Sequence, residues 1–269
     1  MTGAKLTSSR GTLVFGSGPF VLHRLLLGTP ALSDGVVGQR SVEIAGYILP
    51  EGANAAARAA VLERARRLVC RIASAEEGFS LHIRGGRTLR LTCERGPEFA
   101  GEAPLNGTDA AFFTLHAVSA AEDGCLSGEA LTASARGHSG ALIFPLSITA
   151  GTIFGTLSRS GTLTAENPGD AQAGFTLTVT AEGGTLTAFS VSLGERFLAV
   201  SHTLAEGESL CIDTRPGQKD VTAAAGSVLG ETDWRSEFFA LPPGESTLSW
   251  ACEGTGHAAL RLTLTPRYL

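Results

Sequence analysis

The stretch FTLTVT, residues 175–180, places an apolar side chain at every second position. Phe175, Leu177 and Val179 would point to one side of a strand, and the threonines between them to the other. A strand of this kind buries one face and exposes the other to solvent, which is typical of antiparallel sheets. The same alternation recurs in four further stretches: FSVSLG (189–194), ESLCID (208–213), TLSWAC (247–252) and ALRLTLT (259–265). Turn signals about every ten residues between such stretches favour an antiparallel β-sandwich.

The first half of the chain also begins with short apolar runs separated by glycines, which predict strands over residues 11–49. The spacing of apolar residues then changes from every second position to every third or fourth position in EGANAAARAAVLERARRLVCRIAS, residues 51–74. This spacing predicts an amphipathic helix near 54–74. Asn54 is a candidate N-cap because its side-chain carbonyl can accept from a free amide of the first turn. The apolar face would hold Val61, Leu62, Ala65, Leu68, Val69 and Ile72.

A hairpin is predicted after this helix, because FSLHIRGG (79–86) and RTLRLTCE (87–94) are joined by Gly85 and Gly86. A further strand, AAFFTLHAVSA (110–120), precedes a small, polar connection over residues 120–140. A chain of 269 residues exceeds one ordinary core. We therefore expect two domains, residues 1–144 and residues 145–269, in a mainly β protein with one amphipathic helix.

Composition excludes several classes of protein. Hydrophobic residues make up 43% and charged residues 17%, as in folded globular chains. We expect neither a membrane span nor an export signal, since no apolar run approaches the required length. Residues 1–150 carry 14 Lys+Arg against 13 Asp+Glu, and residues 151–269 carry 7 against 13, which argues against a generic nucleic-acid binder. We interpret the five scattered cysteines as reduced, buried small hydrophobes: Cys70, Cys93, Cys125, Cys211 and Cys252.

No residue pattern indicates catalysis. The string from Gly137 to Ala141 resembles a Gly-x-Ser-x-Gly elbow around Ser139, but its last glycine is missing and a strand is expected to follow. The six histidines are scattered singly, without the spacing of metal ligands. We therefore expect no catalytic, metal or cofactor site.

The polar face of the predicted helix is strongly basic. It carries five arginines against the single acid Glu63: Arg58, Arg64, Arg66, Arg67 and Arg71. Two interpretations remain open. The arginines can be an ordinary solvated face, whose long stems shield apolar neighbours, or they can contact an acidic partner surface or passing DNA.

Several stretches of the second half, in their order, resemble the carboxy-terminal domain of the distal tail proteins of long-tailed bacteriophages. They are TLTAENPGDAQAGFTLTV (162–179), GESLCIDTRPGQKDV (207–221), SEFFALPPGESTLSW (236–250) and RLTLTPRYL (261–269). Ser246 departs from the pattern, which has asparagine there. The first half is similar in layout, with Gly46–Tyr47, one arginine-rich helix and the strands leading to FFTLHAVSA (112–120).

The resemblance implies a β-rich ring-forming belt domain followed by a galectin-like β-sandwich. It implies a ring, expected to be a hexamer, at the distal end of the tail tube in the virion, made in the bacterial cytoplasm. Implied partners are the tail tube protein, the tail-associated tip protein and receptor-binding proteins, with DNA passing through the lumen during ejection. No enzymatic activity, cofactor or membrane is implied.

Two other functions compete with this one. A galectin-like sandwich can instead be a carbohydrate-binding module in host attachment, which needs an exposed aromatic platform. Trp250 belongs to an alternating strand, so Trp234 is the candidate platform. The second competitor is a hydrolase using Ser139 and a histidine.

Overall fold

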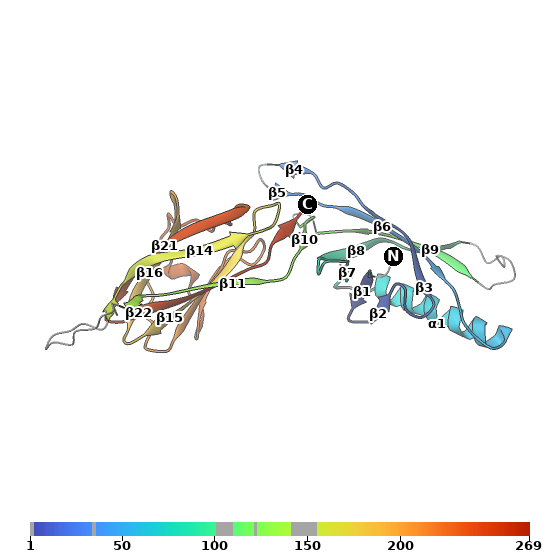
Figure 1. The fold of residues 1–269 in the computed structure, drawn as a ribbon, viewed down its shortest axis with the longest axis horizontal. Coiled ribbons are helices and arrows are strands. Elements are labelled where there is room, and N and C mark those ends of the chain that lie inside the picture. The colour runs from blue at the N-terminus through green and yellow to red at the C-terminus, as the bar shows by residue number, and fades with distance from the viewer. Residues whose placement is uncertain (1–2, 34–35, 101–109, 121–122, 141–154) are drawn as a thin grey trace, which may run out of the picture. The chain divides into compact units, whose positions relative to one another are not determined.

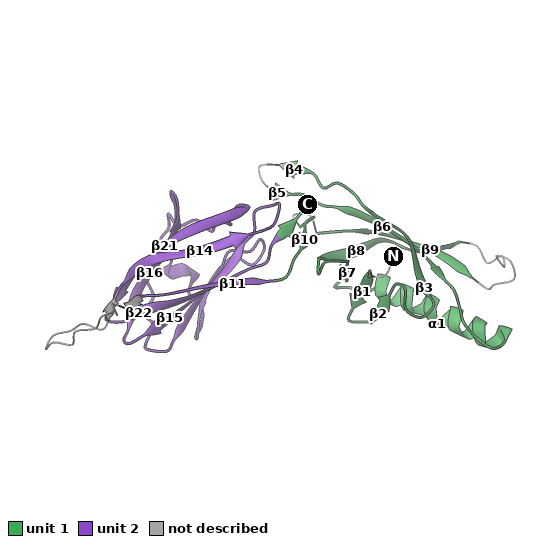
Figure 2. Cartoon of the chain, viewed as in Figure 1, with its two compact units in different colours: residues 1–129, 267–269 green, residues 130–266 purple. Residues whose placement is uncertain are grey.

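The chain folds into two compact units, shown in different colours in Figure 2. A computed structural model describes residues 3–33, 36–100, 110–120, 123–140 and 155–269. Unit 1 comprises residues 1–129 and 267–269, and unit 2 comprises residues 130–266. The expected boundary at residues 144 and 145 lies outside the described residues. The units divide earlier because the strand Leu131–Arg136 already pairs within unit 2.

The predicted fold class is confirmed: the described residues form antiparallel sheets and one α-helix (Figure 1). No helix in these residues has the length and apolar character needed to cross a membrane.

Unit 1 is built on a nine-stranded sheet. Its main path is β2 (Gly11–Val14), β1 (Lys5–Ser8), β7 (Phe79–His82), β8 (Thr88–Ala100), β9 (Ala111–Val118), β6 (Ser41–Ile48) and β3 (Phe20–Leu27). Two short strands join it at the side, β10 (Leu126–Ser127) and β23 (Arg267–Tyr268). The hairpin of β4 (Leu32–Ser33) and β5 (Val36–Val37) is separate. The last residues of the chain are held in unit 1, where Arg267 Nη2 lies 2.8 Å from Asp123 Oδ1.

The helix α1 spans Ala55–Ala73 and covers one face of this sheet. The predicted N-cap is confirmed, because Asn54 Oδ1 accepts from the amide of Ala57 at 2.8 Å. Three helix residues are buried, Ala65, Val69 and Ile72, as the three- and four-residue spacing predicts. They share a core with β1, β2, β6, β7, β8 and β9.

The hairpin of β7 and β8 is also confirmed, but its turn is longer than two residues. The amide of Ile83 donates to the carbonyl of Arg87 at 2.9 Å, so Arg84, Gly85 and Gly86 form the loop between them. Both glycines adopt positive φ, at 89° and 73°, which is the reason for their presence in the turn.

Unit 2 is a sandwich of two antiparallel sheets. The six-stranded sheet follows the order β11 (Leu131–Arg136), β22 (His257–Leu264), β15 (Phe175–Glu182), β18 (Ser209–Asp213), β19 (Asp220–Ala223) and β20 (Gly226–Ser227). The four-stranded sheet follows β14 (Ser160–Asn167), β21 (Gly244–Gly254), β16 (Leu186–Leu193) and β17 (Arg196–Val200). A 3-10 turn η1 (Leu229–Glu231) and a small hairpin of β12 (His138–Gly140) with β13 (Gly155–Leu157) complete the described elements.

The two sheets of unit 2 share one core, to which the alternating strands contribute every second residue. Burial along β15 alternates strictly between buried and half-buried positions, as predicted from FTLTVT. Trp250 of β21 lies opposite Gly161 of β14 and is 3% exposed. A Cβ on Gly161 would lie 2.9 Å from Trp250 Cζ2, so this glycine leaves room for the indole ring.

Two buried polar side chains of unit 2 form hydrogen bonds with backbone groups of the segments that connect its strands. Asn167 Nδ2 donates to the carbonyls of Ala171 and Leu241 at 3.0 and 3.1 Å, and its Oδ1 accepts from the amide of Gly169. Thr214 Oγ1 accepts from the amide of Phe175 at 2.8 Å. Because buried polar groups are costly when unpaired, these bonds hold the turns in one conformation.

The ion pair of Asp213 and Arg215 predicts that the folding stability of unit 2 decreases in acid. Partial burial works to raise the pKa of Asp213, but hydrogen bonds from the Arg215 side chain and amide outweigh it and lower that pKa. Arg215 Nε lies 2.9 Å from Asp213 Oδ1. A carboxyl whose folded pKa is depressed stabilises the fold above its unfolded pKa of about 4, and this stability is lost as pH falls through the folded pKa.

The Asp213→Asn variant should therefore lose less stability than the wild type as the pH falls below about 4. The thermal unfolding midpoint, measured across an acid titration, gives this loss. Arg215→Gln removes the side-chain bonds to Asp213 but keeps the bond from the amide of residue 215, so it should have the same effect to a smaller extent. Identical acid profiles for wild type and both variants would contradict this role.

None of the five cysteines takes part in a disulfide, but their expected burial is only partly confirmed. Cys125 and Cys252 are buried, and Cys93 and Cys211 are half-buried. Cys70 is exposed, because it lies one residue past the buried Val69 and so outside the apolar stripe of α1.

Candidate functional site

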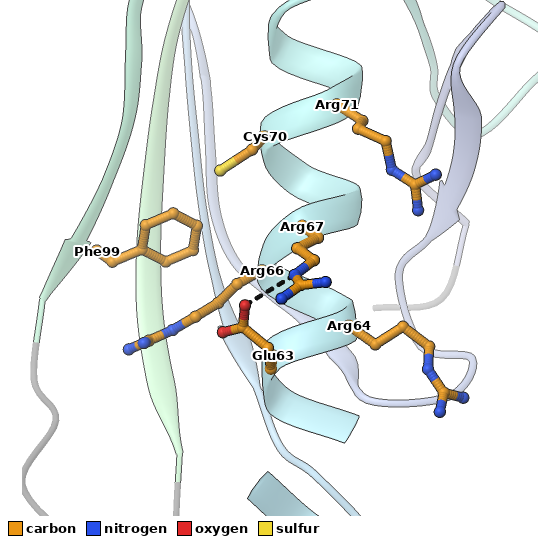
Figure 3. Close-up of a pocket in the computed structure, with 7 residues that line it drawn as sticks. All are labelled: Glu63, Arg64, Arg66, Arg67, Cys70, Arg71 and Phe99. Atoms are coloured by element: carbon orange, nitrogen blue, oxygen red, sulfur yellow. Dashed lines mark hydrogen bonds and ion pairs between the residues drawn. The ribbon is translucent and has the colours of Figure 1, made fainter. Parts of the chain in front are cut away.

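The five candidate arginines all lie on α1, and none is buried. They do not converge on one point. Figure 3 shows Arg66 extending towards Phe99 of β8, while Arg64 and Arg71 extend to the opposite side of the helix. Arg67 Nε forms an ion pair with Glu63 Oε1 at 2.8 Å, one helical turn away. Arg58 Nη1 donates to the carbonyl of Gly52 at 3.5 Å.

A groove of about 710 Å³ runs beside this part of α1 (Figure 3). The Arg66 guanidinium carbon lies 5.4 Å from the centroid of the Phe99 ring, within the range of a cation–π contact. Sequence reasoning missed Phe99 as part of this site, because it comes from β8 and joins the helix only in the folded unit. The groove is lined by Glu63, Arg64, Arg66, Arg67, Cys70, Arg71 and Phe99. Four arginines against one acid make this groove suited to an acidic partner.

The edge strand β3 is a second feature that sequence reasoning missed. In the described residues β3 pairs with β6 alone, so the backbone groups of its other side have no strand partner. Six of the eight residues in its sequence FVLHRLLL are apolar, and Val21 and Leu26 are 39% and 48% exposed. An exposed apolar edge strand is a template for pairing with another chain.

A small aromatic cluster lies next to this edge. The His23 ring centroid is 5.3 Å from that of Tyr47 and 5.8 Å from that of Phe112. Tyr47 and Phe112 are register partners on β6 and β9. They alternate with buried residues of the core, so they lie on the sheet face away from α1.

The structure gives Ser139 no elbow geometry. His138–Gly140 form the strand β12, in which Ser139 pairs with Thr156 of β13. A nucleophile elbow needs the serine at a sharp turn from a strand into a helix. Residues 142–148, which were expected to form the next strand, lie outside the described residues. In the parts of the chain that are described, no three His, Cys, Asp or Glu side chains are grouped to hold a metal ion.

Trp234 is 89% exposed, the highest exposure among the large hydrophobic residues of the described chain. It belongs to the segment 231–237, which runs along the edge strand β17. The amide of Asp233 donates to Ala199 O at 2.9 Å, and the amide of Glu237 donates to Phe197 O at 2.8 Å. These bonds on both sides of Trp234 hold its backbone in place. The Arg235 guanidinium carbon lies 5.6 Å from the centre of its ring.

A polar groove of about 450 Å³ lies on the six-stranded sheet, lined by Ser134, Arg136, Thr178, Thr180, Glu182, Ala259, Leu260 and Arg261. None of these lining residues is aromatic. The segment that holds Trp234 instead lies beside β17, which belongs to the four-stranded sheet. The structure therefore does not bring the candidate sugar platform together with this polar groove.

The fold is similar to that of a solved phage protein. It matches the crystal structure of the Dit protein of SPP1, described as a paradigm of the hub of the adsorption apparatus in phages that infect Gram-positive bacteria. The TM-score is 0.60 at 13% sequence identity, and the match covers 91% of this chain and 89% of that one. At this identity the likeness shows the fold. A comparison with curated proteins finds no match.

Residues 168–268 match the family model of the siphovirus-type tail component, C-terminal domain. Over this part, less than half of the chain, the sequence is similar to a siphovirus-type tail component. The match begins at Pro168, in the turn that joins β14 to β15, and extends to β23.

Proposed function

We propose that this chain is a distal tail protein that forms a closed ring of six copies at the end of the tail tube. Unit 1 supplies the belt of the ring, and unit 2 supplies a sandwich for contacts with other tail proteins. The ring joins the tail tube protein to the tail-associated tip protein and carries receptor-binding proteins, while DNA crosses its lumen during ejection. The match of residues 168–268 to the siphovirus-type tail component domain and the similarity of the fold to that of the SPP1 Dit protein support this function.

The observation that most supports a ring is that the main sheet of unit 1 has two open edges. The main path of the sheet ends at β2 on one side and at β3 on the other. When two different edges of one subunit associate head to tail, the contact repeats from copy to copy and closes into a ring if the rotation allows it. The exposed Val21 and Leu26 add apolar area to the β3 edge.

Native mass spectrometry and negative-stain electron microscopy of the purified protein test this proposal, alone and with its tail tube protein. Sixfold rings are the expected result. A monodisperse monomer that never assembles with tail tube protein would contradict it.

The arginine groove of α1 predicts a salt-sensitive contribution to assembly. We propose that Arg58, Arg64, Arg66, Arg67 and Arg71 face an acidic surface of a partner. Charge reversal of Arg64, Arg66 and Arg67 to glutamate should weaken assembly at low salt, with a smaller effect at high salt because exposed charges are screened. Native mass spectrometry over a salt series measures the ring fraction.

Arg136→Glu, which reverses an arginine in the polar groove of unit 2, is the control for net charge and should leave the rings unchanged. If the triple variant assembles as wild type at every salt concentration, the arginines are an ordinary solvated face.

A further inference from the structure

The polar groove of unit 2 brings two arginines together on the outer face of the six-stranded sheet. Strand register places its lining residues in two rows across β11, β22 and β15, which lie side by side (Figure 1). The rows are Ser134, Arg261 and Thr178, and then Arg136, Ala259 and Thr180. Arg136 and Arg261 are therefore diagonal neighbours on adjacent strands, at a spacing of about 7–8 Å. One anion that lies between their long side chains can contact both.

Neither arginine has an acidic partner within the part of the chain that the structure describes, although acids are in excess in this half of the chain. Residues 151–269 carry 7 Lys+Arg against 13 Asp+Glu. Three other arginines of unit 2 do form ion pairs with acids: Arg196, Arg215 and Arg235. Glu182, the one acid among the lining residues, pairs instead with His257, at 3.3 Å between Oε2 and Nε2. Both guanidinium groups are therefore free to bind an anion from outside the chain.

The groove also offers hydroxyl groups and room for more than a lone ion. The side chains of Ser134, Thr178 and Thr180 line it, and its volume of about 450 Å³ is that of a small-molecule site. The short side chain of Ala259 lies between Arg136 and Thr180, so that no bulky group fills this space. Because none of the lining residues is aromatic, the groove has no stacking surface for a nucleobase or a neutral sugar ring.

From this arrangement we propose that the groove binds a phosphate monoester of a small hydroxyl-bearing molecule, such as a sugar phosphate. A phosphate monoester carries a charge of about −1.5 to −2 and three terminal oxygens, which match two guanidinium groups and the neighbouring hydroxyls. A carboxylate has one charge and two oxygens, so it satisfies fewer of these donors. The hydroxyls of β11 and β15 bond the organic part of the ligand.

This binding goes beyond the proposed function and does not depend on it. All the residues of the groove belong to unit 2, so a preparation that forms no rings still tests the site.

Isothermal titration calorimetry at constant ionic strength tests the site with three related probes: glucose 6-phosphate, glucuronate and glucose. Glucose 6-phosphate should bind with a Kd on the order of 1 mM. Glucuronate should bind at least about tenfold more weakly, because it offers one charge and two oxygens to the same donors. Glucose should give no measurable heat.

Arg136→Gln and Arg261→Gln should each weaken the binding of glucose 6-phosphate by about tenfold or more, since each removes charge-assisted hydrogen bonds. Both side chains are exposed, so the fold should tolerate these changes, and circular dichroism checks it. Arg196→Gln, which removes an exposed arginine of the other sheet, is the matched control and should bind as wild type does.

Four outcomes would overturn the proposal. Equally tight binding of glucose would assign the groove to neutral sugars, and equally tight binding of glucuronate would assign it to carboxylates, such as those of an acidic protein. Binding of glucose 6-phosphate that neither arginine substitution weakens would place the phosphate elsewhere on the chain. Absence of heat from glucose 6-phosphate at about tenfold the expected Kd would exclude the site.

Discussion

Trp250→Ala is expected to lower the free energy of unfolding of unit 2 by about 3–5 kcal/mol, the usual cost of truncating a buried large aromatic residue. The indole ring is 3% exposed and fills the space that Gly161 leaves on the neighbouring strand. Its removal opens a cavity between the two sheets, which surrounding strands can fill only in part. Denaturant unfolding followed by circular dichroism measures the total change, and hydrogen exchange of peptides from β15 and β22 assigns it to unit 2.

The chain contains its own matched control for this substitution, because it has two tryptophans in opposite environments. Trp234→Ala removes the same side chain from a position that is 89% exposed, so the stability should change by less than about 0.5 kcal/mol. Equal effects of the two substitutions would show that Trp250 does not form part of the sandwich core.

The double substitution Val21→Lys and Leu26→Lys is expected to abolish ring formation while leaving the monomer folded. Both side chains are exposed on β3, so the fold of unit 1 should tolerate the change. Two lysines on an edge strand oppose strand addition by another copy, because each charge would have to lose water beside an apolar partner. Native mass spectrometry measures the loss of hexamer, and circular dichroism checks the fold.

Leu131→Lys provides the control, since Leu131 is 41% exposed on β11, which is an edge strand of unit 2. Rings should form normally with this variant. Rings that persist in the β3 double variant would exclude β3 as the edge through which the copies associate.

Much of the fold could be predicted from periodicity, because it depends on neighbours in the sequence. The alternation of FTLTVT predicts the strand β15 and its buried face. The change to a period between three and four predicts α1, and Asn54 marks its start through a bond to an amide three residues later. In each case one residue pattern determines the local structure.

Features that depend on contacts between distant residues could not be predicted in this way. Arg66 turns towards Phe99, which lies 33 residues later on β8, so no pattern within the helix indicates the groove. The exposure of Cys70 could have been predicted, because it lies outside the three- and four-residue stripe of α1. The support of Trp234 depends on bonds to β17, and the free edge of β3 is defined only by the order of strands in the complete sheet.

Electron cryomicroscopy of the tail tip in intact particles tests the ring most directly. The account predicts a continuous ring of six copies between tail tube and tip, with unit 1 around the lumen and β3 of each copy at the contact with the next. A reconstruction in which this chain is present as separate copies outside the tube axis, with no contact between their first units, would contradict it.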